Sequence, residues 1–154
     1  TYRIEITDFN WIMWANPGES FEDVRVEVDA TFTGGPVDQN SYGLICRHQD
    51  IDNFYALLIA SDGAYAIRKR VNGGDLEIIS GEFYEFDDAI RTGETTNRIT
   101  AECVGPILRL SANGTLLVEV VDRDITSGDV GLIATTFDTD QMEVLFDNFV
   151  VYQP

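Results

Sequence analysis

The sequence has 154 residues, which fits one domain, because globular domains most often run to roughly 100–150 residues. Hydrophobic residues make up 44% and charged residues 24%, which excludes a largely disordered or collagen-like chain. No apolar run approaches the roughly 20 residues that cross a bilayer, and the net charge of -17 would repel a nucleic-acid backbone. We therefore expect a single domain over residues 1–154, with no membrane span and no nucleic-acid partner.

Alternating apolar and polar residues predict β-strands along most of the chain. In Val24–Phe32 every second residue is apolar, as in a strand with one face in water. The same pattern predicts further strands at Tyr2–Thr7, Tyr42–Arg47, Phe54–Ala60, Ala64–Val71, Leu76–Ser80, Arg98–Val104, Ile107–Ala112, Thr115–Val121, Val130–Thr136 and Met142–Tyr152. No helical period is sustained, so the fold class is all-β.

Short turns join the predicted strands. Ser61-Asp62-Gly63 supplies residues that tolerate positive φ, and Asn113-Gly114 between two alternating runs is typical of a hairpin. Many short antiparallel strands in one domain must bury their apolar faces against one another. The prediction is a two-sheet antiparallel β-sandwich, or jelly roll, and an eight-stranded barrel is the alternative.

The acidic charge is unevenly distributed. Between Ser41 and Asp75 four basic residues balance four acidic ones, so the rest of the chain carries the full -17. A site for a neutral or anionic ligand is therefore expected in this stretch.

Several strings carry a resemblance to a known group of domains. They are Tyr42-Gly43-Leu44-Ile45-Cys46-Arg47, Asp52-Asn53-Phe54-Tyr55, Ser61-Asp62-Gly63-Ala64-Tyr65-Ala66-Ile67, Asn97-Arg98-Ile99, Cys103-Val104-Gly105, Leu108-Arg109-Leu110-Ser111-Ala112-Asn113-Gly114, Gly128-Asp129-Val130-Gly131-Leu132 and Phe146-Asp147-Asn148-Phe149. Together they resemble laminin-G-like, concanavalin-A-like jelly rolls of bacterial extracellular proteins. This group includes 3-keto-disaccharide hydrolase domains and, more distantly, glycoside hydrolase family 16. The resemblance spans residues 21–153 and implies an extracellular or cell-surface location.

The resemblance also implies that a strand is missing from the sheet. Domains of this kind usually carry one more N-terminal strand, so Tyr2 would begin the second strand of the complete fold. One sheet would then have an unpaired edge, which favours self-association by strand addition.

No catalytic residue is assigned. Family 16 enzymes use a Glu-x-Asp-x-x-Glu strand, and the closest match here, Glu27–Phe32, has Phe32 in place of the final carboxylate. Glu82, Glu85, Asp87 and Asp88 form another acidic cluster, which solvation alone explains. His48 is the only histidine, and no Gly-x-Ser-x-Gly turn presents a nucleophile. We therefore expect no enzymatic activity.

A structural calcium ion and a disulfide are both expected. Asp147 matches the position that holds a structural Ca²⁺ in many concanavalin-like jelly rolls, and the alternative is that it caps backbone amides. Cys46 and Cys103 lie in no Cys-x-x-Cys pair, which leaves one disulfide or two buried thiols. The extracellular context that the resemblance implies favours the disulfide.

Candidate ligand contacts follow from the chemistry of sugar recognition, which uses flat aromatic rings and planar hydrogen-bonding groups. Tyr55 and Arg47 are the first candidates, because they belong to the meander expected to line a concave sheet, open to solvent. Trp14, Arg68 and Arg70 are the others.

The sequence thus predicts a non-catalytic extracellular module that binds carbohydrate or another surface ligand. One alternative is a structural, self-assembling surface subunit that uses its open edge strand. The other is a glycan-active hydrolase.

Overall fold

The computed structural model describes residues 2–6, 11–15, 20–35, 40–136 and 142–153. Within these ranges every element of regular secondary structure is a β-strand. In the described part of the chain no helix is long and apolar enough to cross a membrane.

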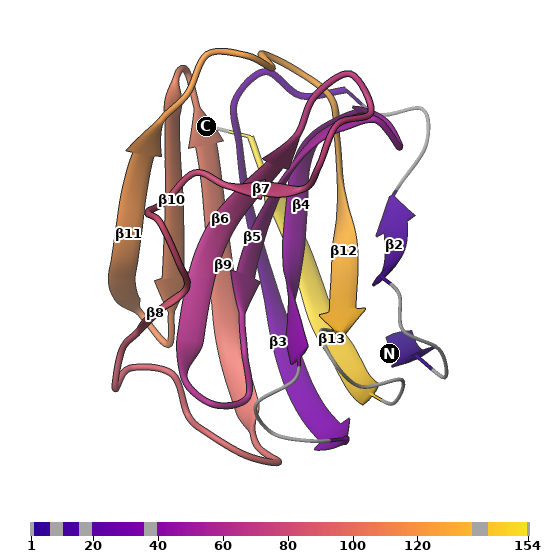
Figure 1. The fold of residues 1–154 in the computed structure, drawn as a ribbon, viewed down its shortest axis with the longest axis vertical. Helices are drawn as coiled ribbons and strands as arrows, with labels where there is room; N and C mark the ends of the chain where they lie inside the picture. The colour runs from indigo at the N-terminus through magenta and orange to yellow at the C-terminus, as the bar shows by residue number, and fades with distance from the viewer. Residues whose placement is uncertain (1, 7–10, 16–19, 36–39, 137–141, 154) are drawn as a thin grey trace.

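The strands form two antiparallel sheets that pack face to face (Figure 1). One sheet has the order β1 (Tyr2–Ile6), β13 (Met142–Tyr152), β3 (Val24–Gly34), β9 (Thr96–Val104), β10 (Ile107–Ala112) and β11 (Thr115–Val121). The other has the order β2 (Trp11–Ala15), β12 (Asp129–Thr136), β4 (Asn40–Asp50), β5 (Asn53–Ile59), β6 (Ala64–Arg70) and β7 (Glu77–Ile78), and β8 (Glu85–Phe86) pairs with β6. The predicted two-sheet sandwich is confirmed, and the barrel alternative is wrong.

Most predicted strands are present, and the differences have simple causes. β2 was missed because Trp11–Ala15 is an unbroken apolar run with no alternation. The predicted strand Leu76–Ser80 shortens to the two residues of β7, and β8 is equally short. β1 and β2 are the outer strands of their sheets on the same side of the sandwich.

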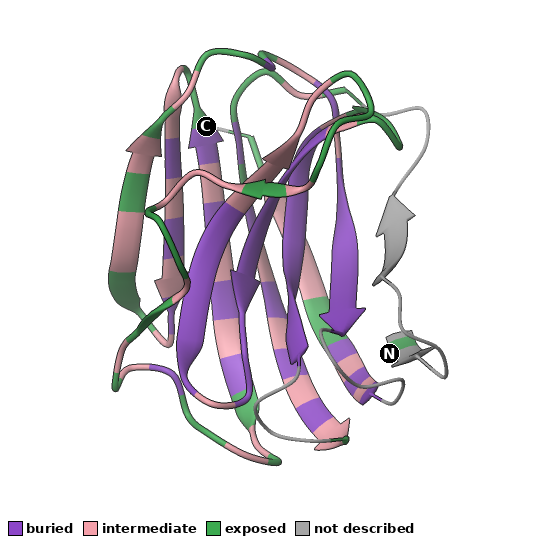
Figure 2. Cartoon of the chain, viewed as in Figure 1, coloured by how far each residue is buried: buried purple, intermediate pink, exposed green. Residues whose placement is uncertain are grey.

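The two sheets differ in how far their outer faces are exposed to water. In the first sheet, burial alternates along β3 as its sequence pattern predicts, so one face packs on the core and the other is wet. In the second sheet, β4, β5 and β12 are buried on both faces over most of their length (Figure 2). The outward-facing side chains there form a second apolar cluster: Ile45, Phe54, Ala56, Leu58 and Ile133.

The segment after β6 helps to cover this outer cluster. Leu76 packs against it, and Figure 1 shows the β7 segment crossing over this sheet. Farther along, the Tyr84 hydroxyl lies 3.0 Å from the Ser41 hydroxyl on β4 and accepts a hydrogen bond from Arg68 on β6. The segment is therefore tied to the outer face by both packing and hydrogen bonds.

A disulfide joins the two sheets through the core. Cys46 on β4 is bonded to Cys103 on β9, and both are fully buried. The predicted disulfide is confirmed, and no described cysteine is a free thiol.

Reduction of this disulfide should lower the free energy of unfolding by about 4 kcal/mol, because the bond closes a loop of 57 residues. Urea unfolding with and without reductant measures the change. The double variant Cys46→Ala/Cys103→Ala should not respond to reductant. Two reactive thiols in the unreduced, unfolded protein would contradict the bond.

Candidate functional site

Arg47 is buried, so the prediction that it lies open to solvent on a concave sheet is wrong. A β-bulge interrupts the pairing of β4 at this point, and Arg47 has a left-handed φ of 53°. Its guanidinium donates to the carbonyl oxygens of Ile125 and Glu22 at 3.1 and 2.8 Å. Burial lowers the pKa of Arg47, while Tyr55 and Asp23 act in the opposite direction.

Tyr55 is also fully buried, which corrects the same prediction for it. Its side chain points into the core between the sheets, and its hydroxyl donates to Asp122 and accepts the backbone N–H of Ile125. Burial, followed by the contact with Asp122, raises the pKa of Tyr55 well above its usual range. Tyr55 therefore anchors the β11–β12 connection.

Lys69 on β6 also binds the β11–β12 connection. Its ammonium donates to Asp122 at 2.8 Å and also to Asp124. Burial of Asp122 acts to raise its pKa, but hydrogen bonds from Lys69 and Tyr55 outweigh burial and hold the pKa below its usual value.

Two of the other predicted ligand contacts, Arg68 and Arg70, lie on β6 and bind backbone carbonyls. Arg68 donates to the Leu76 carbonyl at 2.6 and 3.0 Å, and Arg70 donates to the carbonyls of Gly73 and Gly74. Both arginines thus hold the segment after β6. The Trp14 side chain lies outside the described residues.

Asp147 is exposed in a bulge of β13, where Asn148 has a φ of 54°. Its Oδ1 accepts the N–H of Asn148 at 2.9 Å, as the backbone-cap alternative requires. The described residues contain no group of three or more His, Cys, Asp or Glu side chains arranged to hold a metal ion. The calcium ion at Asp147 stays a prediction.

The two carboxylates of the strand that resembles the family 16 motif are both engaged in ion pairs. Glu27 and Asp29 lie on the wet face of β3, where both form ion pairs with Arg98 at 3.5 and 3.3 Å. Phe32 packs into the core and stacks on Tyr42.

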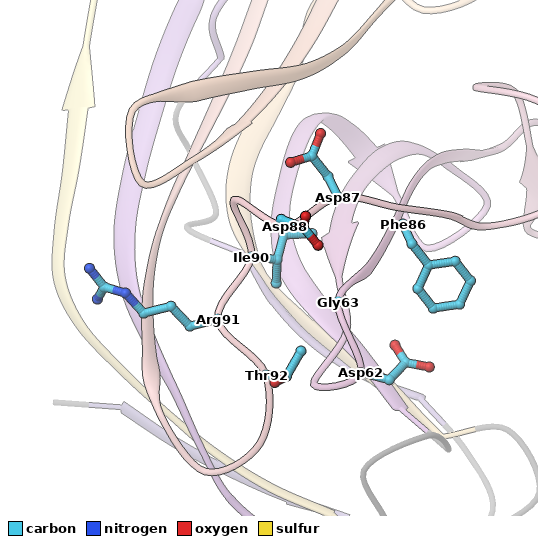
Figure 3. Close-up of a pocket in the computed structure, with 8 residues that line it drawn as sticks. All are labelled: Asp62, Gly63, Phe86, Asp87, Asp88, Ile90, Arg91 and Thr92. Carbon is cyan, nitrogen blue, oxygen red and sulfur yellow. The ribbon is translucent and has the colours of Figure 1, made fainter.

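A pocket of about 420 Å³ lies at one end of the sandwich, between the β5–β6 turn and the segment after β8. We call it the Phe86 pocket. Its lining residues are Asp62, Gly63, Phe86, Asp87, Asp88, Ile90, Arg91 and Thr92 (Figure 3).

Backbone hydrogen bonds hold the two walls of the Phe86 pocket together. The N–H of Asp87 donates to the Gly63 carbonyl at 3.1 Å, and Gly63 has a left-handed φ of 93° that suits the tight β5–β6 turn. Asp62 and Asp87 each accept a backbone N–H two residues ahead through Oδ1. These hydrogen bonds thus hold the β5–β6 turn, which forms one wall of the pocket, in place.

The pocket combines an exposed aromatic ring with several carboxylates. The Phe86 residue is 68% exposed, and Figure 3 shows its ring on the same side of Gly63 as the Asp62 carboxylate. The Arg91 side chain extends away from these groups and donates to the Thr96 carbonyl. The lining therefore offers an apolar platform beside mainly negative hydrogen-bond acceptors.

Sequence reasoning assigned Asp87 and Asp88 to a solvated acidic cluster and missed Phe86, Arg91 and Thr92. An available signal was the spacing of Phe83 and Phe86 within an acidic segment that lacks strand alternation. Nothing in the sequence shows that this segment folds back against the β5–β6 turn.

No protein-family model and no curated protein sequence matches this chain. Similar solved structures include the carbohydrate-binding module CBM66 from Bacillus subtilis, with a TM-score of 0.76 and 16% identity over 97% of this chain and 86% of that one. A protein with a galectin-like fold from Bacillus subtilis has a TM-score of 0.70 and 15% identity, covering 96% and 80%. Sheep galectin-11 in complex with glycerol has a TM-score of 0.62 and 8% identity, covering 93% and 98%.

These identities establish a shared fold and nothing finer. The fold agrees with the predicted concanavalin-A-like sandwich. The closer resemblances to laminin-G, 3-keto-disaccharide hydrolase and family 16 domains stay predictions.

The ion pair at Asp122 should make stability depend on pH. Because its folded-state pKa is lowered, its contribution is present above the unfolded pKa of about 3.9 and is lost as pH falls through the folded value. Asp122→Asn should cost about 1–3 kcal/mol at pH 7 and progressively less below pH 4. Urea unfolding across this range tests it, and Asp124→Asn, which removes a more exposed carboxylate, should cost less.

If Asp147 holds a structural Ca²⁺, added calcium should raise the melting temperature and a chelator should lower it. Asp147→Ala should abolish both responses. A wild-type melting curve unchanged by chelator would leave Asp147 as a backbone cap only.

Proposed function

We propose that this domain binds carbohydrate without cleaving it, in the Phe86 pocket. The observation that carries the proposal is an exposed Phe86 ring on the same side of Gly63 as the Asp62 carboxylate, in a pocket that Asp87 and Asp88 also line. Sugar rings present an apolar C–H face that stacks on aromatic rings, and hydroxyls that donate to carboxylates. Both kinds of contact are available within this pocket.

The charge of the pocket favours a neutral sugar. The three aspartates carry negative charge, and the Arg91 guanidinium is directed away from them. An acidic sugar would therefore be repelled by these carboxylates on approach. We therefore propose a neutral oligosaccharide as the ligand.

Two further observations support this function. A carbohydrate-binding module and a galectin share the fold of this chain. The buried disulfide suits an oxidising compartment, which supports a secreted or cell-surface location.

The hydrolase alternative rests on the three carboxylates of the pocket, since glycoside hydrolysis uses a pair of Asp or Glu residues. The self-assembly alternative rests on β1 and β2, the outermost strands of their sheets. Neither alternative uses the exposed Phe86 ring.

Phe86→Ala should weaken binding of neutral oligosaccharides at least about tenfold, because it removes the stacking platform. A glycan array identifies a ligand, and calorimetry measures its affinity. Phe86→Ala and a control variant, Phe83→Ala, should both keep the wild-type melting temperature, since Phe86 and Phe83 are 68% and 73% exposed.

Phe83→Ala is the matched control, because Phe83 lies on the same segment but does not line the pocket. Equal losses in the two variants, or no neutral glycan bound, would contradict the proposed site. Release of reducing ends from a bound glycan would support the hydrolase instead.

A further inference from the structure

One wall of the Phe86 pocket is a segment without regular secondary structure (Figure 3). Residues 87–92, between β8 and β9, form no strand, and only Ile90 among them is buried. Two of its hydrogen bonds are local: the Ile90 N–H donates to the Asp87 carbonyl at 3.2 Å, and the Ala89 N–H donates to Asp87 Oδ1 at 2.8 Å. Such bonds shape a turn but do not fix its place in the molecule. The position of this wall therefore depends on contacts with other parts of the fold.

Asn97 supplies two of those contacts from the first sheet. It lies at the start of β9 and is completely buried. Its Oδ1 accepts the Arg91 N–H at 2.8 Å, and its Nδ2 donates to the Arg91 carbonyl at 3.0 Å. A primary amide offers a donor and an acceptor side by side, which an ionised carboxylate does not. The Asn97 side chain thus pairs with both polar groups of one backbone residue in the pocket wall.

Asn113 supports Asn97 from the β10–β11 turn. Its Nδ2 donates to Asn97 Oδ1 at 2.8 Å and to the Ala89 carbonyl at 2.9 Å. Its Oδ1 accepts the Arg98 N–H, and its own N–H donates to the Arg98 carbonyl, both at 2.8 Å. The wall is therefore attached at Ala89 and Arg91 to two asparagines of the same sheet.

The other wall, the β5–β6 turn, is attached to the second sheet by a similar contact. Asn40 on β4 is 1% exposed. Its Oδ1 accepts the Ser61 N–H at 3.1 Å, and its Nδ2 donates to the Ser61 hydroxyl at 2.7 Å. The Gly93 N–H donates to the Ser61 carbonyl at 2.8 Å and so joins the two walls. Each wall is thus held by a buried asparagine from a different sheet.

We infer that Asn97 is a positioning residue for the Phe86 pocket, an inference that rests on the proposed function. Asn97 does not line the pocket. It holds the Arg91 backbone, so that the Asp87 and Asp88 carboxylates keep one arrangement before a sugar binds. A site that is ordered in advance binds more tightly than one that must be ordered on binding, because ordering costs conformational entropy. Loss of the Asn97 amide should therefore weaken binding although it removes no contact with the sugar.

Hydrogen exchange of backbone amides in the sugar-free, disulfide-bonded chain tests the first step. Asn97→Ala should speed exchange of the Arg91 N–H about tenfold, because that N–H loses its acceptor. Asn53→Ala is the matched control, since Asn53 Oδ1 likewise accepts a distant backbone N–H, that of Asn72 at 2.9 Å, at the end of β5 away from the pocket. The control should speed exchange at Asn72 and leave Arg91 unchanged.

Calorimetry tests the second step, with maltotriose, cellotriose and the strongest neutral binder of the glycan array as probes. The affinity should fall about tenfold in Asn97→Ala and stay at the wild-type value in Asn53→Ala. If Asn97→Ala does not fold, Asn113→Gly takes its place, because glycine tolerates the left-handed φ of 52° and only the side chain is lost. Asn113→Gly should also speed exchange at Arg91 and weaken binding.

The inference is overturned if exchange at Arg91 does not change in the folded variant. It is also overturned if the variant binds sugar as tightly as the wild type, or if Asn53→Ala loses as much affinity. A wild-type protein that binds no neutral glycan would overturn the proposed function, whereas faster exchange confined to the Arg91 wall would still support Asn97 as the residue that holds this wall.

Discussion

Burial of the second sheet on both faces determines which surfaces of this domain are exposed to water. The inner face packs on the first sheet, as in any sandwich. The outer face is closed as well, because Ile45, Phe54 and Leu58 are completely inaccessible to water. The Phe86 pocket lies instead at one end of the sandwich, where turns rather than sheet faces form the surface.

Buried polar side chains hold the β11–β12 connection in place. Arg47 binds two backbone carbonyls, and Tyr55 binds both Asp122 and the N–H of Ile125. These bonds tie the β11–β12 connection to β4 and β5, and Lys69 adds β6. Because unsatisfied buried groups are costly, the network favours one conformation of a connection that has little apolar surface of its own.

Carboxylates at the two ends of the sandwich have different partners. Asp62 and Asp87 in the Phe86 pocket accept backbone N–H groups, whereas Asp122 and Asp124 in the β11–β12 connection bind the Lys69 ammonium. At physiological ionic strength the Debye length is about 8 Å, so local charges influence each site more than the net charge of the chain does.

The sequence by itself determined most of the strands and turns and the sandwich, because alternation and turn chemistry are local properties. It also identified the two cysteines, although only the packing of β4 against β9 across the sandwich decided that they bond. The burial of the Arg47 and Tyr55 side chains could not be predicted, because it depends on a bulge in β4 and on hydrogen bonds to the distant β11–β12 connection. The Phe86 pocket likewise depends on contacts between the β5–β6 turn and a segment more than 20 residues later, and no local pattern encodes such a contact.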